Sequence, residues 1–343
     1  MDPVTHMLTG ACLSRTGLNR KTGLATLTII LACEAPDLDS LFYFAGSVAG
    51  LQHHRGITHS FVGAPFVAAL VLAGAYIVCW AMQRAGREPK LPPNWKLLYL
   101  YALGGALLHL FQDSTNNYGV RPWAPFSEKW HSWDIVFIID PIMLLALFLG
   151  LVVPGLFALV TEEIGSRKAG PRGRGGAIFA LVCVALLIFV RDFEHRRAVA
   201  ALTARTYQGE EPLRASAFPH PINPFSWNGV VETRDFFILL PVNSQSGEID
   251  PDELATVRPK PEETPVTLAA KKSYLGQVYL DWAGYPLVST EKLENGHYQV
   301  QFEDLRFESL QGITRNHRPP LAGYAIVDQQ LRVEKMWVGR PPE

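Results

Sequence analysis

Histidines and aspartates stand at the edges of several apolar runs in the first third of the sequence. His6 follows Asp2-Pro3, a pair typical of a helix N-cap with proline at the first helical position. His109-x-x-x-Asp113 ends another apolar run, and its spacing of four places both side chains on one helical face. Both side chains are then within reach of one metal ion or of a bridged pair. The candidate metal ligands are His6, Asp37, His54, His59, His109 and Asp113.

The residue types in this set suit zinc or another divalent transition metal, which accepts mixed imidazole and carboxylate ligands, whereas calcium prefers an all-oxygen cage. One zinc ion needs three or four ligands, and the set offers more than that. We therefore expect two or three ions, with zinc as the simplest choice. Each residue by itself also fits a plainer role, such as a helix cap for Asp37 or an interfacial position for His54 and His59.

Two residues beside the candidate ligands are expected to take part in catalysis. Arg55 lies in the segment 54–60 (HRGITHS), and its guanidinium could bind a phosphate through two parallel hydrogen bonds. A lipid head group or a backbone carbonyl is an equally good partner for it. Asp39 lies in the segment 36–39 (PDLD), which ends an apolar run with two carboxylates. These residue types favour attack of a metal-activated water on a phosphoester.

Long apolar runs predict that helices carry these residues in a membrane. A spanning helix needs about 20 mostly apolar residues, and residues 61–82 form a run of 22 without a charge. The run 23–33 is too short alone and is expected to pair with 4–13 as half-helices. We therefore expect a mostly α membrane bundle of about four to five spans or half-spans. The remaining runs are 97–111, 135–160 and 176–190.

Lysine and arginine are concentrated in two of the predicted loops, 83–96 and 161–176. Short loops rich in these residues stay in the cytoplasm. The sparsely basic loops 35–60 and 112–134 then face outward, together with the candidate ligands and the C-terminal part. The sequence thus predicts a multi-pass membrane protein with an extracytoplasmic site.

The C-terminal part has the composition of a soluble domain. We expect a membrane-embedded domain over 1–190, a helical extension and proline-rich linker over 191–228, and a mainly antiparallel β (α+β) domain over 229–343. Residues 234–235 are expected to join the first two strands in a hairpin, and His220, His297 and His317 are expected at the surface. The predicted strands are 230–233, 236–242, 276–280, 298–302, 324–327 and 331–338.

Composition excludes some classes of function. The net charge of -1 argues against a nucleic-acid-binding protein, which usually carries a basic stripe. None of the four cysteines has a C-x-x-C partner, so they are interpreted as small buried apolar residues rather than ligands. The first residues are acidic where a cleavable signal peptide carries positive charge. The cysteines are Cys12, Cys33, Cys79 and Cys183.

The motifs also resemble a known family. The segments 1–6 (MDPVTH), 36–39 (PDLD) and 54–60 (HRGITHS), and His109-x-x-x-Asp113 followed by YG and PFS, resemble the membrane-bound metal-dependent hydrolases. That family includes LexA-regulated inner-membrane hydrolases of bacteria and is distantly similar to zinc-dependent phospholipase C and single-strand nucleases. The resemblance implies that Asp113 bridges two metals beside His109 and that the other candidate ligands complete the shell. It adds Asp39, Asp134, Asp140 and His131 as lesser candidates.

Two functions from different classes remain open. The first is hydrolysis of a phosphoester in a lipid or another envelope-associated molecule. The second is a non-enzymatic membrane protein, either a metal-binding transporter or a regulator. A transporter should show internal repeats, and the sequence shows none, which favours the enzyme. The sequence indicates the lipid bilayer as a partner and leaves the oligomeric state open.

Overall fold

The computed structural model describes residues 1–163, 173–247, 249, 255–310 and 321–341. The chain divides into two compact units. The helical unit contains Met1–Leu38, Arg55–Glu194 and Pro219–Pro224. The strand-rich unit contains Asp39–His54, His195–Phe218 and Phe225–Glu343. The predicted domain boundaries at residues 190 and 228 remain a prediction.

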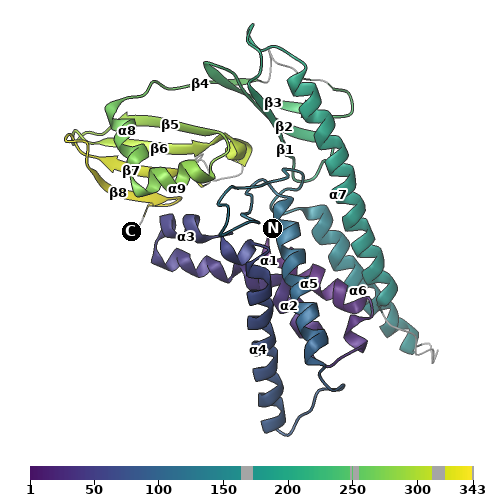
Figure 1. Ribbon diagram of the computed structural model, residues 1–343. Helices are drawn as coiled ribbons and strands as arrows, with labels where there is room; N and C mark the ends of the chain where they lie inside the picture. Colours follow the sequence, from purple (N-terminus) through teal and green to yellow (C-terminus); the bar gives the residue numbers. More distant parts are fainter. Residues whose placement is uncertain (164–172, 248, 250–254, 311–320, 342–343) are drawn as a thin grey trace. The chain divides into compact units, whose positions relative to one another are not determined.

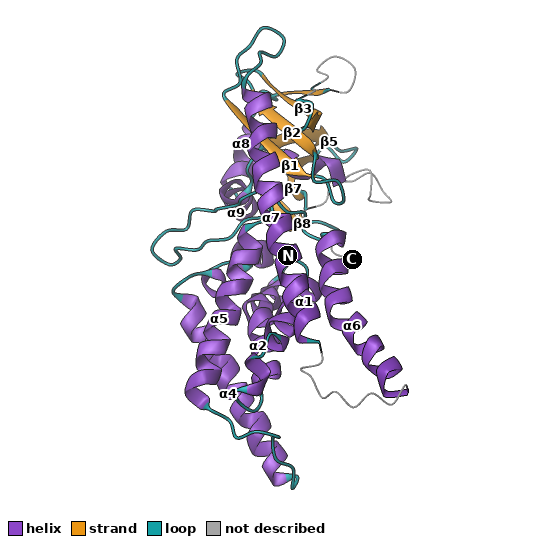
Figure 2. Cartoon of the chain, turned by 90° about the vertical axis from the view of Figure 1, so that its right-hand side faces the viewer, coloured by secondary structure: helices purple, strands orange, loops and turns teal. Residues whose placement is uncertain are grey.

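Local sequence signals begin the helices of the helical unit. At the helix that begins at Pro3, the Asp2 carboxylate accepts a hydrogen bond from the backbone N–H of Thr5 at 3.0 Å. At the helix that begins at Trp95, the Asn94 side chain accepts from the backbone N–H of Leu97 in the same way. The helices are drawn in Figure 2. They are α1 (Pro3–Arg15), α2 (Ala25–Glu34), α4 (Gly63–Arg84), α5 (Trp95–Ser114) and α6 (Pro141–Glu163), with the short helices η1 (Leu18–Arg20) and η3 (Ile57–His59). The short helix η2 (Ala35–Ala45) and the long helix α7 (Arg174–Thr203) begin in this unit and end in the strand-rich unit.

Small residues let these helices pack closely. α2 packs against α1 and α5, and α5 packs against α4. A Cβ atom at Gly105 of α5 would lie only 2.7 Å from Ala32 Cβ of α2, so the contact between these helices requires glycine there. Buried alanines, including Ala64, Ala68 and Ala102, fill the space among α2, α4 and α5. Close packing among these three helices fixes the end of α5 beside the end of α2.

Two helices within the described ranges, α4 and α7, are long and apolar enough to cross a membrane. Only 28% of the most apolar 18-residue stretch of α4 and 22% of that of α7 are buried, whereas the core helix of a soluble protein is mostly buried. The expectation of four to five spans or half-spans is therefore too high by this measure. The run 135–160 forms α6, whose described apolar part, Pro141–Phe157, is shorter. The run 97–111 forms α5, whose ends carry Lys96, Gln112 and Asp113 and lower its mean hydropathy.

The two ends of the helical unit differ in character. The loop before α2 and the loop before α5 meet at one end, where the backbone N–H of Asn94 donates to Thr22 Oγ1 at 2.7 Å. The basic residues of loop 83–96 follow α4 at this same end. Of the other predicted basic loop, Arg167, Lys168 and Arg172 lie outside the described residues. The starts of α1 and α4 and the ends of α2 and α5 lie at the opposite end.

The strand-rich unit contains two four-stranded antiparallel sheets (Figure 1). β2 and β3 pair in antiparallel register, with Glu232 opposite Phe237, which confirms the predicted hairpin. α3 (Ser47–His53) also belongs to this unit, and α8 (Pro265–Lys272) and α9 (Tyr274–Trp282) pack on the second sheet. The first sheet consists of β1 (Arg214–Pro219), β2 (Ser226–Glu232), β3 (Phe236–Asn243) and β4 (Thr256–Pro259). The second consists of β5 (Pro286–Lys292), β6 (Tyr298–Asp304), β7 (Gly323–Val327) and β8 (Val333–Val338).

Two local predictions in this unit are wrong. The predicted strand 276–280 lies within α9, which Ser273 caps by accepting from the backbone N–H of Gly276. Leu275, Val278 and Tyr279 are buried at helical rather than alternating spacing, so the short apolar run was ambiguous between helix and strand. The proline-rich linker predicted within 191–228 contains β1 and the start of β2.

Candidate metal centre

Five of the predicted ligands meet at one end of the helical unit. His6 comes from the first turns of α1, Asp37 from η2 just after α2, and His59 from η3 just before α4. His109 and Asp113 come from the last turns of α5. The helix packing explains this meeting, because the end of α5 lies beside the end of α2 and the start of α4. Residues separated by more than a hundred positions therefore share one small volume.

Four ligand atoms in this volume are spaced like the ligands of one tetrahedral ion. His59 Nε2 lies 3.0 Å from His109 Nε2, 3.2 Å from Asp37 Oδ1 and 3.3 Å from Asp113 Oδ2. His109 Nε2 lies 3.6 Å from Asp37 Oδ1 and 3.5 Å from Asp113 Oδ2. A tetrahedral zinc ion with bonds of about 2.0–2.1 Å holds its ligand atoms about 3.3–3.4 Å apart. Asp37, His59, His109 and Asp113 could therefore hold a metal ion without large movement.

Hydrogen bonds on the far side of the rings orient two of the histidines. His109 Nδ1 donates to the backbone carbonyl of Cys33 at 2.6 Å, which leaves the lone pair of Nε2 facing the other ligands. His6 Nδ1 lies 3.1 Å from Gln112 Oε1, and the Gln112 amide donates to Thr9 Oγ1 at 3.0 Å. Because the amide nitrogen of Gln112 donates to Thr9, its oxygen is the group that accepts from His6 Nδ1. His6 therefore carries its proton on Nδ1, and the lone pair of its Nε2 also faces inward.

Asp113 stands between two groups of ligands. Its Oδ2 faces His59 and His109, whereas its Oδ1 lies 3.2 Å from His6 Nε2. The amino group of Met1 also contacts Oδ1. The His6 and His109 rings are stacked with centroids 3.9 Å apart, so His6 lies just outside the four-ligand group. Asp113 therefore contacts both groups, each through a different oxygen.

Burial distinguishes one ligand from the others. The side chains of His6, His59, His109 and Asp113 are fully buried, but that of Asp37 is 19% exposed. Burial alone would raise the pKa of Asp37, yet the hydrogen bond with His59 and the neighbouring imidazoles outweigh it and lower that pKa. Asp37 therefore stays ionised and lies where the cluster meets the outside.

Arg55 is committed to partners inside the helical unit. Its Nε lies 3.1 Å from Asp113 Oδ2, and its Nη1 donates to Asn116 Oδ1 at 3.0 Å and to the Gly119 carbonyl at 3.3 Å. The guanidinium also lies over the Tyr118 ring, 4.8 Å from its centroid. Arg55 has a φ of 57°, which a non-glycine residue rarely adopts. These contacts orient Asp113, and the predicted binding of a phosphate by Arg55 stays a prediction.

The remaining candidate residues lie in other settings. His54 Nδ1 lies 2.8 Å from Asp39 Oδ1, and both residues belong to the strand-rich unit. Their predicted roles in ligation and catalysis stay predictions. Asp140 caps α6 and lies 2.8 Å from Arg191 Nη2, so it forms a separate buried ion pair. His131 is exposed and pairs with Val120 through its backbone.

Two residues at this end of the unit were missed by the sequence analysis. Gln112 orients His6, and its position three residues after His109 on the same helix was the available signal. Glu34 ends the apolar run of α2, and its buried Oε1 has no hydrogen-bond partner among the described residues. Burial, together with the negative charges of Asp37 and Asp2, raises the pKa of Glu34 to about 7.

Comparison with known proteins supports the membrane location. A family model described as YdjM inner membrane protein matches residues 1–198. The chain is also similar to a Bacillus subtilis (strain 168) protein described as uncharacterized protein YfhP. The identity is 26% over 350 residues, which is 99% of this chain and 95% of that relative. No solved structure matches the chain.

Proposed function

The chain belongs to the YdjM inner membrane protein family, and we propose that it is a metal-dependent hydrolase that cleaves a phosphoester. The observation that carries this proposal is the tetrahedral spacing of Asp37, His59, His109 and Asp113. Imidazole and carboxylate donors at these distances favour zinc. The second oxygen of Asp113, facing His6, supports a second ion. This arrangement also supports the proposed distant similarity to zinc-dependent phospholipase C.

The residues of the site have distinct tasks in this proposal. A divalent metal bound here would lower the pKa of a bound water and neutralise charge on the phosphoester oxygens. The carbonyl of Cys33 and the amide of Gln112 hold the rings of His109 and His6 with their lone pairs inward. Arg55 holds Asp113 in one orientation. Asp37, the partly exposed ligand, marks where a substrate could approach.

The test is metal content and hydrolysis measured on the same purified full-length protein. We expect more than one divalent ion per chain by elemental analysis, together with hydrolysis of bis(4-nitrophenyl) phosphate. His59→Gln should lose metal and activity together, because Gln cannot replace an imidazole ligand. His131→Gln is the matched control, since His131 is exposed and its hydrogen bonds to Val120 come from its backbone. A wild-type protein that folds without metal and keeps its activity would exclude the proposal.

A regulatory or structural metal site is the second candidate. Structural zinc sites are closed by four protein ligands, whereas catalytic sites keep a position for water. Four ligand atoms at tetrahedral spacing fit the structural case as well. The two candidates differ in one result: chelation should abolish hydrolysis in the enzyme, whereas it should change only stability in a regulator.

We further propose a multi-pass topology with the metal centre outside the cytoplasm. The apolar helices α4 and α7 supply the membrane anchor. The end of α4 and the loop after it carry Arg84, Arg87 and Lys90 at the end opposite the metal centre, and basic loops favour the cytoplasm. A reporter fused after residue 343 is expected to behave as extracytoplasmic. Cytoplasmic reporter activity would reverse this topology.

A further inference from the structure

The surface of the helical unit near Asp37 is apolar although it is exposed. Val4 and Met7 lie one turn apart on α1 and are 55% and 47% exposed. Leu31 of α2 and Leu38 of η2 are 40% and 51% exposed. In a soluble protein such side chains would be expected to face a core or a partner.

These side chains form one surface rather than isolated exposed residues. Gly10 of α1 packs closely against Ile30 and Cys33 of α2, so the part of α1 that carries Met7 meets the end of α2. Leu31 precedes Glu34 by one helical turn, and Leu38 follows Asp37 directly. The one ligand of the cluster with an exposed side chain therefore lies at the edge of an apolar surface.

Exposed aromatic residues lie at this end of the helical unit. Phe61 follows His59 by two residues, and its ring lies 5.0 Å from that of Trp123. Trp123 and Phe126 are 55% and 86% exposed. Exposed tryptophan and other aromatic side chains are characteristic of the boundary between head groups and acyl chains. The span α4 begins at Gly63, two residues after Phe61.

We propose that the substrate is a phospholipid that reaches the metal centre from the bilayer. Its phosphodiester enters beside Asp37, and its acyl chains stay on the apolar surface formed by Val4, Met7, Leu31 and Leu38. The family's membrane location and the exposed apolar side chains of this surface support lipid as the occupant. This inference rests on the proposed phosphoesterase function and adds its substrate class.

The experiment compares two substrates with the same reacting group. One is phosphatidylglycerol in vesicles of equal parts phosphatidylglycerol and phosphatidylethanolamine, and the other is glycerophosphoglycerol, the same head group without acyl chains. The full-length, metal-loaded protein should cleave the lipid with a kcat/KM at least about tenfold higher, because binding of remote substrate parts contributes to catalysis. Bis(4-nitrophenyl) phosphate serves as the probe of the reaction itself.

The outcomes separate this inference from the proposed function. Equal kcat/KM for phosphatidylglycerol and glycerophosphoglycerol would overturn the proposal of a lipid substrate and leave the phosphoesterase function intact. Cleavage of bis(4-nitrophenyl) phosphate alone would do the same. Failure on all three substrates by a metal-loaded protein would overturn both.

A variant at the apolar surface provides a second measurement. Leu38→Gln should raise KM for the vesicle substrate several-fold and leave cleavage of bis(4-nitrophenyl) phosphate unchanged. Leu100→Gln is the matched control, because Leu100 is 60% exposed near the start of α5, at the opposite end of the unit. It should alter neither rate. Equal effects of the two substitutions on the lipid rate would overturn the role of the surface.

Discussion

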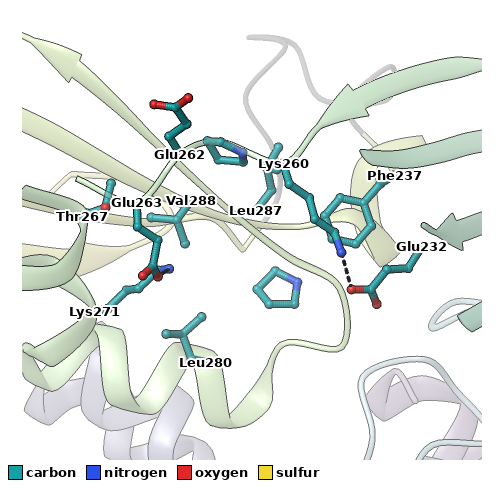
Figure 3. A pocket seen from close by; sticks show the side chains of 12 residues that line it. Glu232, Phe237, Lys260, Glu262, Glu263, Thr267, Lys271, Leu280, Leu287 and Val288 are labelled. Atoms are coloured by element: carbon teal, nitrogen blue, oxygen red, sulfur yellow. Dashed lines mark hydrogen bonds and ion pairs between the residues drawn. The ribbon is translucent and has the colours of Figure 1, made fainter. Parts of the chain in front are cut away.

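Charged residues are used differently in the two compact units. In the helical unit His59, His109 and Asp113 are fully buried and contact one another. In the strand-rich unit, charged residues mostly pair at or near the surface, as Lys260 does with Glu232 at 2.9 Å (Figure 3). That pair lines a cavity of about 310 Å³, whose other lysine, Lys271, pairs with Glu263.

The difference indicates where function resides. Burying ionisable groups costs several kcal/mol each unless other interactions compensate, so a folded domain rarely gains stability from such a cluster. Surface pairs cost little and contribute little. A buried set of convergent imidazoles and carboxylates is therefore better explained by a bound cation than by stability. The following predictions test this comparison.

The largest effect is expected for Asp113→Asn. The substitution removes one negative charge from between the candidate cation positions, and even residues behind metal ligands cost about 10- to 100-fold in affinity or activity. Metal content and hydrolysis should therefore fall together, by at least about 100-fold in rate. The variant also leaves the buried Arg55 without the charge of Asp113, which costs up to about 3–5 kcal/mol. Elemental analysis, hydrolysis and thermal unfolding are measured on one preparation.

A double variant separates the two roles of Asp113. Asp113→Asn combined with Arg55→Met removes both members of the buried contact, so part of the lost stability should return. Metal content should stay low, because the ligand is still missing. If the double variant regains metal as well as stability, Asp113 acts through folding and not as a ligand.

The elements of the helical unit were easier to predict than its spans. Each long apolar run forms a helix, because an apolar stretch of that length has few other ways to satisfy its backbone. Sequence could not show that α5 packs against α2 and α4 through small residues such as Gly105 and Ala102. In the strand-rich unit the short runs left helix and strand undecided, as at Leu275–Tyr279 in α9, because periodicity over five residues is weak evidence.

The candidate site was predictable in membership and less so in arrangement. Sequence spacing placed His109 and Asp113 on one face, which the helix α5 shows. It could not show that Arg55 turns toward Asp113, since this depends on the unusual backbone φ of 57° at Arg55 itself. Nor could it show that His54 contacts Asp39, because that pairing depends on how η2 and α3 fold back on each other.

The second largest effect is expected at a buried ion pair outside the cluster. Arg191 of α7 and Asp140 at the start of α6 are fully buried and 2.8 Å apart. Arg191→Met leaves the Asp140 charge without this partner and should cost about 3–5 kcal/mol in unfolding free energy. Metal content of the folded fraction should not change. The double variant with Asp140→Asn should recover much of the lost stability. If the folded Arg191→Met protein also loses metal, metal content responds to a buried ion pair outside the cluster, and the comparison no longer identifies the cluster as the metal site.

The smallest effect is expected for Lys260→Met in the strand-rich unit. Burial would raise the pKa of Glu232, but the hydrogen bond from Lys260 and the charges of Arg214 and Lys260 outweigh it and lower that pKa. A lowered pKa contributes stability at pH values above the unfolded pKa of about 4.3, and this contribution disappears as the pH falls through the folded pKa. Because both side chains of the pair are partly exposed, the loss at neutral pH should be at most about 1 kcal/mol.

The measurement for Lys260→Met is amide hydrogen exchange in β2 and β3, which reports the strand-rich unit separately from the membrane helices. The difference from wild type should shrink in high salt, which screens exposed charges, and as the pH falls through the lowered pKa of Glu232, where its carboxylate becomes protonated. Glu291→Gln, at an exposed site on β5, is the control and should change little. A loss above about 3 kcal/mol at neutral pH would match the buried pair of Arg191, and the contrast between the two units would then no longer separate functional from ordinary charge.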